Sequence, residues 1–310
     1  AAELARALDL LAAAGLRAVV LKGAHTARAY FPEPGTRPMA DLDLAVWPRE
    51  GDGGRALEAA ERALERAGYR VRKRQPRVER SEWLAPGSPD VPRSLELCHA
   101  DDPYALDLHG SLARNFFGVR RVRVAPLGPG SVRPWPELHP AASRLAEPAL
   151  AAFLAAHASE GLHNLTLLRL VELVLVLRAD VAAGALRWDE LQALVESAGA
   201  LRFVYPAFEL AERLAPGTVD AGFRAALARA ATPAMRRVLS GLAPSGAQRP
   251  ERLSALERLM WAATPLEHLR RLAEMAWPLS AVGSARGVVR LYAERFFRLV
   301  RRRVGWRGPE

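Results

Sequence analysis

The sequence has little of three things: cysteine, lysine and long apolar runs. Its 310 residues include a single cysteine, Cys98, which excludes an intrachain disulfide and argues against a thiol metal site. It has no run of 18 uncharged apolar residues, so no transmembrane helix and no membrane association are expected. Residues 1–15 contain Glu3 and Asp9 and lack a basic segment, which is typical of an amphipathic helix rather than a signal peptide. These features predict a cytoplasmic protein.

Lysine is scarce although the chain is basic. The sequence has 44 lysines and arginines against 34 acidic residues, a net charge of +10, but only Lys22 and Lys73 are lysines. A positive excess favours polyanionic partners: nucleotides, nucleic acid or an anionic membrane surface. Lysine carries a compact point charge, whereas arginine is a planar fork. The lysine at position 22 therefore indicates a need for a compact cation there.

The two halves of the chain have different patterns. The first alternates between helical and strand spacing, and the second is helical throughout, with a proline-rich stretch at 126–140 between them. We expect an α+β fold, in which residues 1–140 form a mixed sheet flanked by helices and residues 141–310 form an all-α domain. The expected strands are 16–21, 40–46, 69–74, 78–84, 94–99 and 104–109, with a turn at 101–103. The expected helices are 1–15, 23–31, 54–67, 145–157, 162–177, 188–198, 202–214, 221–230, 255–261 and 282–303.

The strictly alternating segment ADLDLAV carries two acidic residues. Successive strand side chains point to opposite faces, so Asp41 and Asp43 share one face while Leu42, Leu44 and Val46 face a core. Neighbouring carboxylates repel one another unless a cation lies between them, and Mg²⁺ prefers oxygen ligands. An isolated Asp-x-Asp pair on a strand is usually just solvated, so its meaning depends on the segments around it.

A second acidic strand can complete the site. In YALDLH, Asp107 and His109 share one face. Three carboxylates from two strands can hold two metal ions about 4 Å apart, an arrangement suited to in-line phosphoryl or nucleotidyl transfer.

The segment before the first acidic strand suits an anionic ligand. Lys22 and Gly23 lie where an expected strand runs into a short helix, whose free N–H groups attract phosphate. Gly23 allows close approach of the backbone, and Lys22 adds a point charge. Arg37 precedes the acidic strand and can reach the same phosphates or the leaving pyrophosphate. Alternatively, Lys22 only flanks a strand and Arg37 only ties down a loop.

These residues resemble the signature of a bacterial family of uncharacterised nucleotidyltransferases within the polymerase-β-like superfamily. The resemblance covers residues 1–215 and is strongest over 16–47. The matching positions are Leu21-Lys22-Gly23, Tyr30, Arg37-Pro38, Asp41-Leu42-Asp43 and Asp107-Leu108-His109. The chain departs from the pattern at Gly110, where the family usually has an aromatic residue. It also departs at Lys22-Gly23, where the superfamily more often has Gly-Ser.

The resemblance implies a reaction and a set of roles. Asp41, Asp43 and Asp107 would be the catalytic metal ligands, and Lys22, Gly23, Arg37 and His109 would bind the nucleotide. Mg²⁺ or Mn²⁺ would be the metal and a nucleoside triphosphate, with ATP favoured, the donor. In the helical half, His157, His163, Arg169 and Glu172 would line the acceptor side, although in a helical bundle such residues are often only capped, paired or solvated. The acceptor would carry a hydroxyl group and be a small molecule, a peptide or a protein.

Other readings of the sequence stay open. The net charge also suits a toxin-like transferase acting on transfer RNA, or an RNA-binding protein, with Arg72–Arg74, Arg120-Arg121 and Arg301–Arg303 as contacts. A non-catalytic relative that binds a nucleotide or a peptide is a second alternative, although the three aspartates argue against it. The last helix, rich in phenylalanine and arginine, either packs on the helical bundle or lies on a membrane surface, and packing is the favoured alternative.

Overall fold

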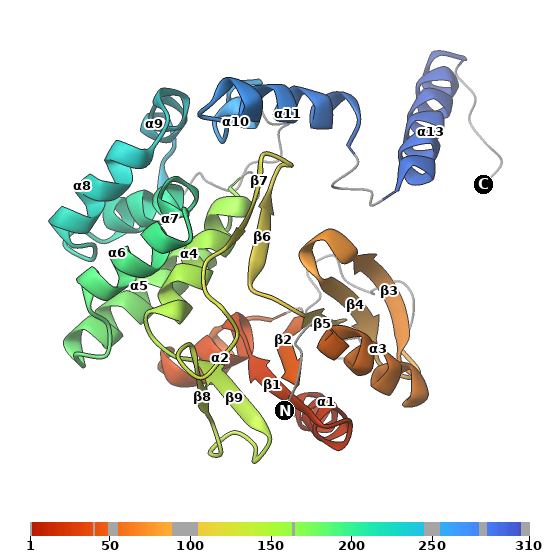
Figure 1. The fold of residues 1–310 in the computed structure, drawn as a ribbon, viewed down its shortest axis with the longest axis vertical. Helices are drawn as coiled ribbons and strands as arrows, with labels where there is room; N and C mark the ends of the chain where they lie inside the picture. The colour runs from red at the N-terminus through yellow and green to blue at the C-terminus, as the bar shows by residue number, and fades with distance from the viewer. Residues whose placement is uncertain are drawn as a thin grey trace.

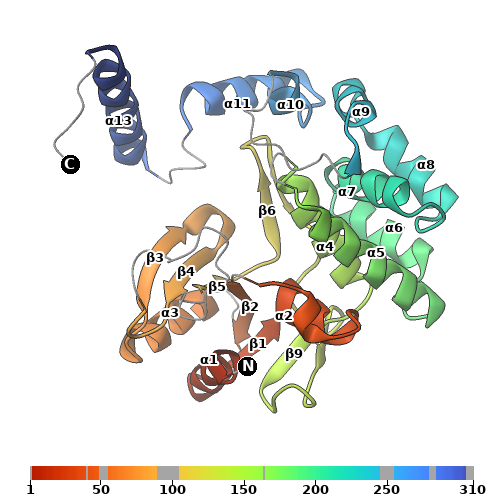
Figure 2. The same cartoon turned by 180° about the vertical axis from the view of Figure 1, so that it is seen from behind.

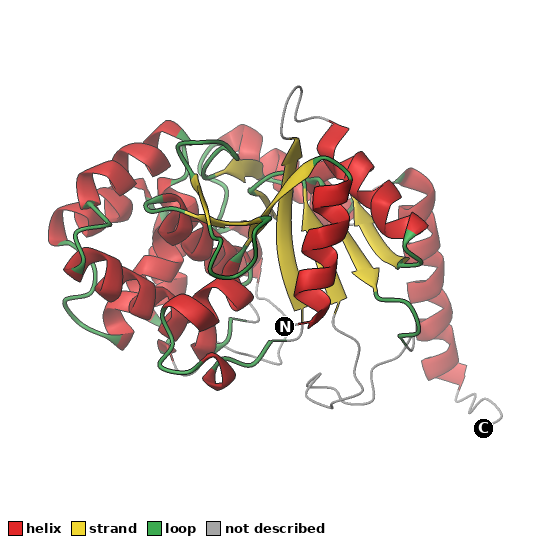
Figure 3. Ribbon diagram, turned by 90° about the horizontal axis from the view of Figure 1, so that it is seen from below, coloured by secondary structure: helices red, strands yellow, loops and turns green. Residues whose placement is uncertain are grey.

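The computed structural model describes residues 2–39, 41–48, 55–88, 105–162, 165–244, 255–278 and 284–304. The expected strand at 94–99, the turn at 101–103, Cys98 and His163 lie outside the described residues. Viewed from below, a sheet part and a helical part lie side by side (Figure 3). The α+β architecture expected from the sequence, a mixed sheet flanked by helices and followed by further helices, is confirmed.

A mixed sheet of seven strands forms the first part, in the order β3-β4-β5-β2-β1-β9-β8. The strands are β1 (Leu16–Val20), β2 (Asp41–Pro48), β3 (Arg70–Gln75), β4 (Arg80–Leu84), β5 (Ala105–His109), β8 (Val132–Pro134) and β9 (Ala142–Leu145). β2 is antiparallel to β1 and parallel to β5, and β4 is antiparallel to β5. The two acidic strands are therefore parallel neighbours near the centre of the sheet (Figure 1).

The two faces of the sheet have different cores. Leu42, Leu44 and Val46 pack with helices α1 (Ala2–Ala13) and α3 (Ala56–Arg66). On the opposite face, Val19 and Ala45 belong to the core that extends into the helical part. The expected alternation along β2 is thus confirmed. Asp41 and Asp43 lie on the face turned toward the helical part of the chain, away from α1 and α3.

The helical part is built around one central helix. Helix α4 (Ala149–Glu160) is apolar on all sides and almost entirely buried, as expected for a helix surrounded by others. Around and beyond it lie α5 (Leu167–Ala182), α6 (Trp188–Ser197), α7 (Leu201–Leu214), α8 (Ala221–Ala230), α9 (Pro233–Ser240), α10 (Ala255–Leu259), α11 (Pro265–Ala276) and α13 (Ala285–Val304). Of the described helices, none combines the length and the apolar character needed to cross a membrane.

Helix α2 (Lys22–Ala29) joins the two parts. Seen from behind, it lies beside α5 (Figure 2). Tyr30, directly after α2, donates a hydrogen bond of 2.9 Å from its hydroxyl to Asp180 Oδ2 on α5. The segment with the strongest family resemblance therefore sits at the junction of sheet and helices.

Some expected elements differ from the observed ones. Leu145, the expected first residue of a helix, is instead the last residue of β9, which pairs parallel with β1. The sheet therefore continues past residue 140, while the division into two domains at that residue stays a prediction. The sequence interpretation also lacked α9, α11 and the hairpin of β6 (Ala113–Phe116) and β7 (Arg120–Arg123). The turn of this hairpin has positive φ angles of 54° at Phe117 and 76° at Gly118, and the glycine was its one local signal.

The favoured position of the last helix was wrong. Helix α13 lies apart from the α4–α9 bundle, on the side of β3 and β4 (Figure 1). Amphipathic spacing predicts a helix with one apolar face but does not say which surface that face meets. The side chains of residues 295–304 lie outside those described.

A buried acidic pair lies where β9 meets the helices. Burial, together with a hydrogen bond to Asp180 and the charge of Asp180, raises the pKa of Glu147 to about 9. Glu147 therefore keeps its proton near neutral pH, and the two carboxyl groups share it. Tyr30 donates its hydroxyl to the same aspartate, so the pair fastens α2 and β9 to α5.

The Glu147 proton gives the fold a testable dependence on pH. A glutamate with the ordinary pKa of 4.5 ionises in the unfolded chain, whereas the folded chain holds the proton up to about pH 9. This contribution to the free energy of unfolding is present in full below about pH 4.5 and is lost as the pH rises through about 9. Glu147→Gln, which mimics the protonated side chain, is expected to remove the dependence. Urea unfolding of both proteins at several pH values measures it.

The exposed Glu137 supplies the control. Glu137→Gln should leave the pH profile of the wild type unchanged. Parallel profiles for the wild type and Glu147→Gln would contradict the shared proton.

Candidate active site

Three carboxylates meet on the helix-facing side of the sheet. Asp43 on β2 lies directly opposite Asp107 on the parallel neighbour β5. Their residues are 3% and 2% exposed, whereas the side chain of Asp41, two residues before Asp43, is 40% exposed. The aspartates predicted to act together are thus brought together, two in the interior and one at the rim.

Two cations neutralise this group. Lys22 places Nζ 2.6 Å from Asp43 Oδ2 and 3.7 Å from Asp41 Oδ2. Arg80 on β4 forms an ion pair with Asp107. Lys22 therefore contacts protein carboxylates directly, rather than only flanking a strand.

Sequence reasoning missed Arg80. β4 is antiparallel to β5 with Arg80 opposite His109, which puts both side chains on the face of the aspartates. The local sequence shows only an arginine at the start of a strand. Its position beside Asp107 depends on strand order, which no local pattern gives.

The pKa values show how crowded the site is. Burial raises the pKa of Asp107 to about 6, although Arg80 opposes this. Burial and the charge of Asp43 raise the pKa of Asp41. For Asp43 burial acts in the same sense, but Lys22 and His109 together outweigh it and hold the pKa well below its usual range. Asp43 is therefore the permanently ionised member of the group.

One compact group is suited to a metal ion. Within the described part of the chain, Asp43, Asp107 and His109 offer ligand atoms that all lie within 4.8 Å of one another. His109 Nε2 is 3.2 Å from Asp43 Oδ1, and burial lowers the pKa of His109 to about 3, so its ring is neutral, as metal ligation requires. Two carboxylates and an imidazole fit a divalent ion that accepts nitrogen, such as Mn²⁺, as well as Mg²⁺. An entering ion would displace Lys22 from Asp43 and Arg80 from Asp107.

The start of α2 is suited to an anion. Its N-cap residue, Leu21, has an extended backbone and no side-chain cap, so the first N–H groups of the helix have no side-chain acceptor. The space next to Gly23 is not open, however. A Cβ atom there would lie 3.3 Å from the sulfur of Met39 and 3.4 Å from Arg37 Nη1. Gly23 therefore allows Arg37 and Met39 to pack closely over α2.

Arg37 and Glu172 form a clamp between the sheet part and α5. Arg37 Nε and Nη2 each lie 3.0 Å from one oxygen of Glu172, and the Thr26 hydroxyl donates to the same carboxylate. The Arg37 and Glu172 side chains are both buried, at 10% and 3% exposure. The two residues predicted to meet ligands meet each other in this structure, and their roles toward ligands stay predictions.

Two residues of the helical part lie near the carboxylates or near the cations around them. Burial lowers the pKa of Arg169 on α5, although Asp41, Glu172 and Asp43 attract its charge, and its side chain has no hydrogen bond or ion pair with any described residue. Burial and the charges of Lys22, Arg114, Arg169 and Arg80 hold the pKa of His157 well below its usual range. His157 on α4 is thus a neutral group in a positive surrounding. Arg114 on β6, a buried neighbour of the same site, was missed by sequence reasoning.

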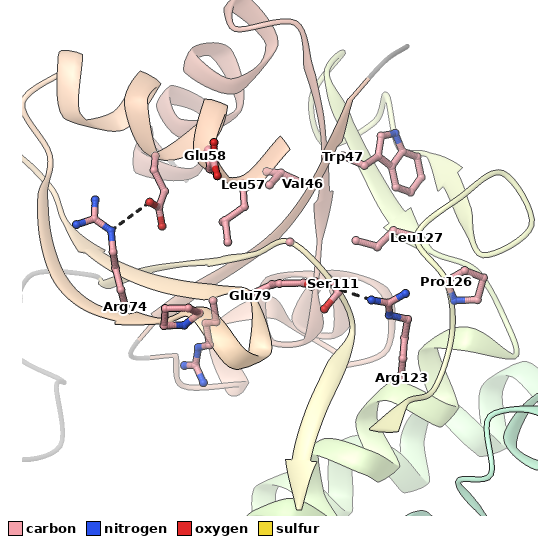
Figure 4. A pocket seen from close by; sticks show the side chains of 14 residues that line it. Val46, Trp47, Leu57, Glu58, Arg74, Glu79, Ser111, Arg123, Pro126 and Leu127 are labelled. Atoms are coloured by element: carbon pink, nitrogen blue, oxygen red, sulfur yellow. Dashed lines mark hydrogen bonds and ion pairs between the residues drawn. The ribbon is translucent and has the colours of Figure 1, made fainter. Parts of the chain in front are cut away.

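A cavity of about 530 Å³ lies beyond Arg80. Leu57 and Glu58 of α3 lie on one side of it, and Arg123, Pro126 and Leu127 on the other (Figure 4). Most of its charges are paired, because Arg74 Nε lies 3.1 Å from Glu61 Oε2 and Arg123 Nη2 lies 4.0 Å from Glu79 Oε2. Gly110 lines it too, and a Cβ there would lie 3.1 Å from Leu57 Cβ, so a side chain at this position would press against Leu57 of α3.

Comparison with protein families identifies the chain. Residues 1–216 match a family described as uncharacterised nucleotidyltransferases. The chain belongs to this family. Comparison with curated proteins and with solved structures gave no match. The family match ends just after α7, so this nucleotidyltransferase family includes helices α4–α7 as well as the sheet.

Removing the ammonium group of Lys22 should expose the repulsion between the aspartates. Lys22→Met is expected to lower the melting temperature in a chelator, because loss of one partner of a buried ion pair costs about 3–5 kcal/mol. Mg²⁺ should then stabilise the variant more than the wild type, since the ion no longer competes with the lysine. Thermal unfolding with and without Mg²⁺ measures both effects.

The second lysine is the matched control for this experiment. Lys73 is exposed on β3, so Lys73→Met should show the wild-type response to Mg²⁺. Equal stabilisation of wild type and Lys22→Met by Mg²⁺ would rule out competition at the aspartates.

The clamp between Arg37 and Glu172 predicts a strongly coupled pair. Glu172→Met leaves a buried guanidinium unpaired and is expected to destabilise by about 3–5 kcal/mol, whereas the double variant with Arg37→Met should recover much of that loss. A double-mutant cycle by urea unfolding gives the coupling energy. The exposed pair of Arg187 and Asp189 should show nearly additive effects in a parallel cycle, because solvent screens it. Additive effects at Arg37 and Glu172 would show that the clamp adds no coupling.

Proposed function

We propose that the chain is a Mg²⁺-dependent nucleotidyltransferase of the polymerase-β-like type. It would transfer a nucleoside monophosphate from a nucleoside triphosphate, with ATP favoured, to a hydroxyl group of an acceptor and release pyrophosphate. The observation that carries the proposal is the pairing of Asp43 with Asp107 on adjacent parallel strands, beside the uncapped start of α2. Mn²⁺ is the alternative metal, because His109 belongs to the compact group.

The residues divide into roles by position. Asp43, Asp107 and His109 would hold the metal, with Asp41 at the rim completing the set when the nucleotide is bound. Such a metal supplies positive charge to the phosphates and so stabilises the charge that develops during transfer. The N–H groups at the start of α2 and the unpartnered guanidinium of Arg169 would bind the triphosphate. Lys22, released from Asp43, would reach the same phosphates.

The transfer itself needs one bond formed and one broken. The acceptor oxygen bonds to the α-phosphorus as the bond from that phosphorus to the pyrophosphate oxygen breaks. The hydroxyl proton must leave as the new bond forms. Asp107 is the proposed acceptor of this proton, because its carboxylate lies directly opposite Asp43, beside the place where the metal would be held.

We propose the same division of labour for the two parts of the chain. Residues 1–140, with β9 completing the sheet, would bind metal and nucleotide, and residues 141–310 would provide the acceptor side. His157 supports this assignment, since it lies on α4 in the helical part, among the cations Lys22, Arg80 and Arg114 that surround the carboxylates. A cytoplasmic location stays a prediction.

The RNA alternative has less support. Arg72 is paired with Glu82, Arg74 with Glu61 and Glu65, and Arg121 with Glu79. Arginines that are neutralised by acidic neighbours add little to a phosphate-binding surface. A non-catalytic relative would bind the nucleotide without turnover, and measurement of pyrophosphate release distinguishes it from an enzyme.

Asparagine in place of the paired aspartates tests the proposal. Asp43→Asn and Asp107→Asn are each expected to lower Mg²⁺-dependent pyrophosphate release by about a hundredfold or more, because each removes a charge that holds the metal. Circular dichroism establishes that the fold is intact. The surface variant Asp189→Asn should match the wild type. Unchanged pyrophosphate release in both site variants would contradict the proposed function.

A further inference from the structure

Arg114 is a buried cation with unused donors. It lies on β6, and its residue is 4% exposed. Glu160 Oε2 is 3.5 Å from its Nη1, while its Nε and Nη2 find no hydrogen-bond acceptor among the described residues. A guanidinium has five N–H donors, and burying them without acceptors costs free energy. Donors left open in this way indicate a ligand that supplies the acceptors.

The position of Arg114 is fixed by one face of α4. Phe153, His157 and Glu160 are four and three residues apart, so they lie along the same side of that helix. The Arg114 guanidinium lies 4.9 Å from the Phe153 ring centre and also reaches Glu160. It therefore runs past His157, which lies between these two contacts. The hairpin that carries Arg114 lies beside α4 (Figure 1).

His157 adds another open nitrogen at the same place. Its Nδ1 is buried and has no partner among the described side chains or backbone groups. The charges that act most on its ring are Lys22, Arg114, Arg169 and Arg80, all of them positive. A neutral imidazole in such a field can donate a hydrogen bond to an anion. Arg114 and His157 together thus offer up to three donor nitrogens in a positive surrounding.

Arg114 approaches the carboxylates from another side than Arg169 does, and His157 lies close enough for the charges of both to act on it. Arg114 is attracted by Asp43 and Asp107, whereas the largest attraction on Arg169 comes from Asp41. The cavity beyond Arg80 is a separate space. Arg123 lines that cavity, and its neighbour Val122 points to the opposite face of the hairpin, into the core. Arg114 lies opposite Val122 on the paired strand, so its side chain is on the core face and not on the cavity face.

We propose that Arg114 and His157 form an oxyanion subsite for the acceptor. The acceptor would then carry a phosphate or carboxylate close to the hydroxyl that attacks, and Arg114 would hold this group while Asp107 receives the proton. The assignment to the acceptor rests on the proposed function, which puts the attacking hydroxyl of the acceptor beside Asp107. A phosphate or carboxylate supplies the oxygen acceptors that a guanidinium fork binds in pairs.

The first experiment measures binding and needs no turnover. The protein is saturated with Mg²⁺ and α,β-methylene-ATP, and inorganic phosphate and glycerol 3-phosphate are titrated by calorimetry. Arg114→Gln is expected to weaken binding of both probes about tenfold or more, with the affinity for the nucleotide within about twofold. Arg114→Lys keeps the charge but loses the planar fork, so its affinity for the probes should fall between those of the wild type and Arg114→Gln. It also serves as the test variant if Arg114→Gln does not fold.

Arg202 supplies a closely matched control. It is also buried, lies 4.6 Å from a phenylalanine ring centre, pairs with a glutamate and has an unpartnered Nε, but it is on α7. Arg202→Gln should therefore bind both probes like the wild type. Probe binding that is equal in wild type and Arg114→Gln overturns the subsite. Loss of nucleotide affinity without loss of probe affinity assigns Arg114 to the triphosphate and also overturns it.

The second experiment separates this proposal from the proposed function. Pyrophosphate release is measured with glycerol, glycerate and glycerol 3-phosphate, which share hydroxyl groups and differ in charge. Stimulation by an anionic acceptor but not by glycerol supports the subsite, and the better of the two anions identifies its chemistry. Equal stimulation by glycerol overturns it. Arg114-dependent binding without any pyrophosphate release would support the subsite while counting against nucleotidyl transfer.

Discussion

The structure depends on one electrostatic constraint, the burial of Asp43 and Asp107 opposite each other on parallel strands. At 3% and 2% exposure these carboxylates have almost no water to separate their charges. Lys22 and Arg80 supply the missing positive charge from either side, Lys22 from the start of α2, which follows β1, and Arg80 from the start of β4. The strand order β4-β5-β2-β1 therefore sets the charge balance of the site, because it puts a cation next to each of the two buried aspartates.

Much of this was readable from the sequence, and the reason lies in short-range geometry. The two-residue alternation of a strand suffices to place Asp41 beside Asp43 and Asp107 beside His109. What the alternation cannot give is the neighbour of each strand. Arg80 reaches Asp107 because β4 pairs antiparallel with β5, and Arg114 reaches α4 because a hairpin docks there. Both depend on contacts between segments far apart in the chain, so no local pattern pointed to them.

A second difference between sequence and structure concerns what a charged residue meets. Arg37 and Glu172 were both identified from the sequence, yet they were assigned to different ligands. In the structure they form an ion pair with each other, although 135 residues separate them in the sequence, and this pair ties α5 to the loop before β2. Lys22 likewise contacts Asp43 rather than open solvent. A sequence shows that a charge is present at a junction, but only the fold shows whether another side chain already neutralises it.

The same charge balance limits how metal and nucleotide enter the proposed site. Lys22 and Arg80 already pair with the carboxylates, and Arg114 and Arg169 add positive charge nearby. A bare divalent ion would therefore enter a site whose negative charges are in use. A triphosphate brings its own negative charge. If the ion arrives with a triphosphate and the aspartates bind the ion, Lys22 and Arg169 can pair with the phosphates instead. Metal and nucleotide should accordingly bind more favourably together than either does alone, because each removes the electrostatic cost of admitting the other.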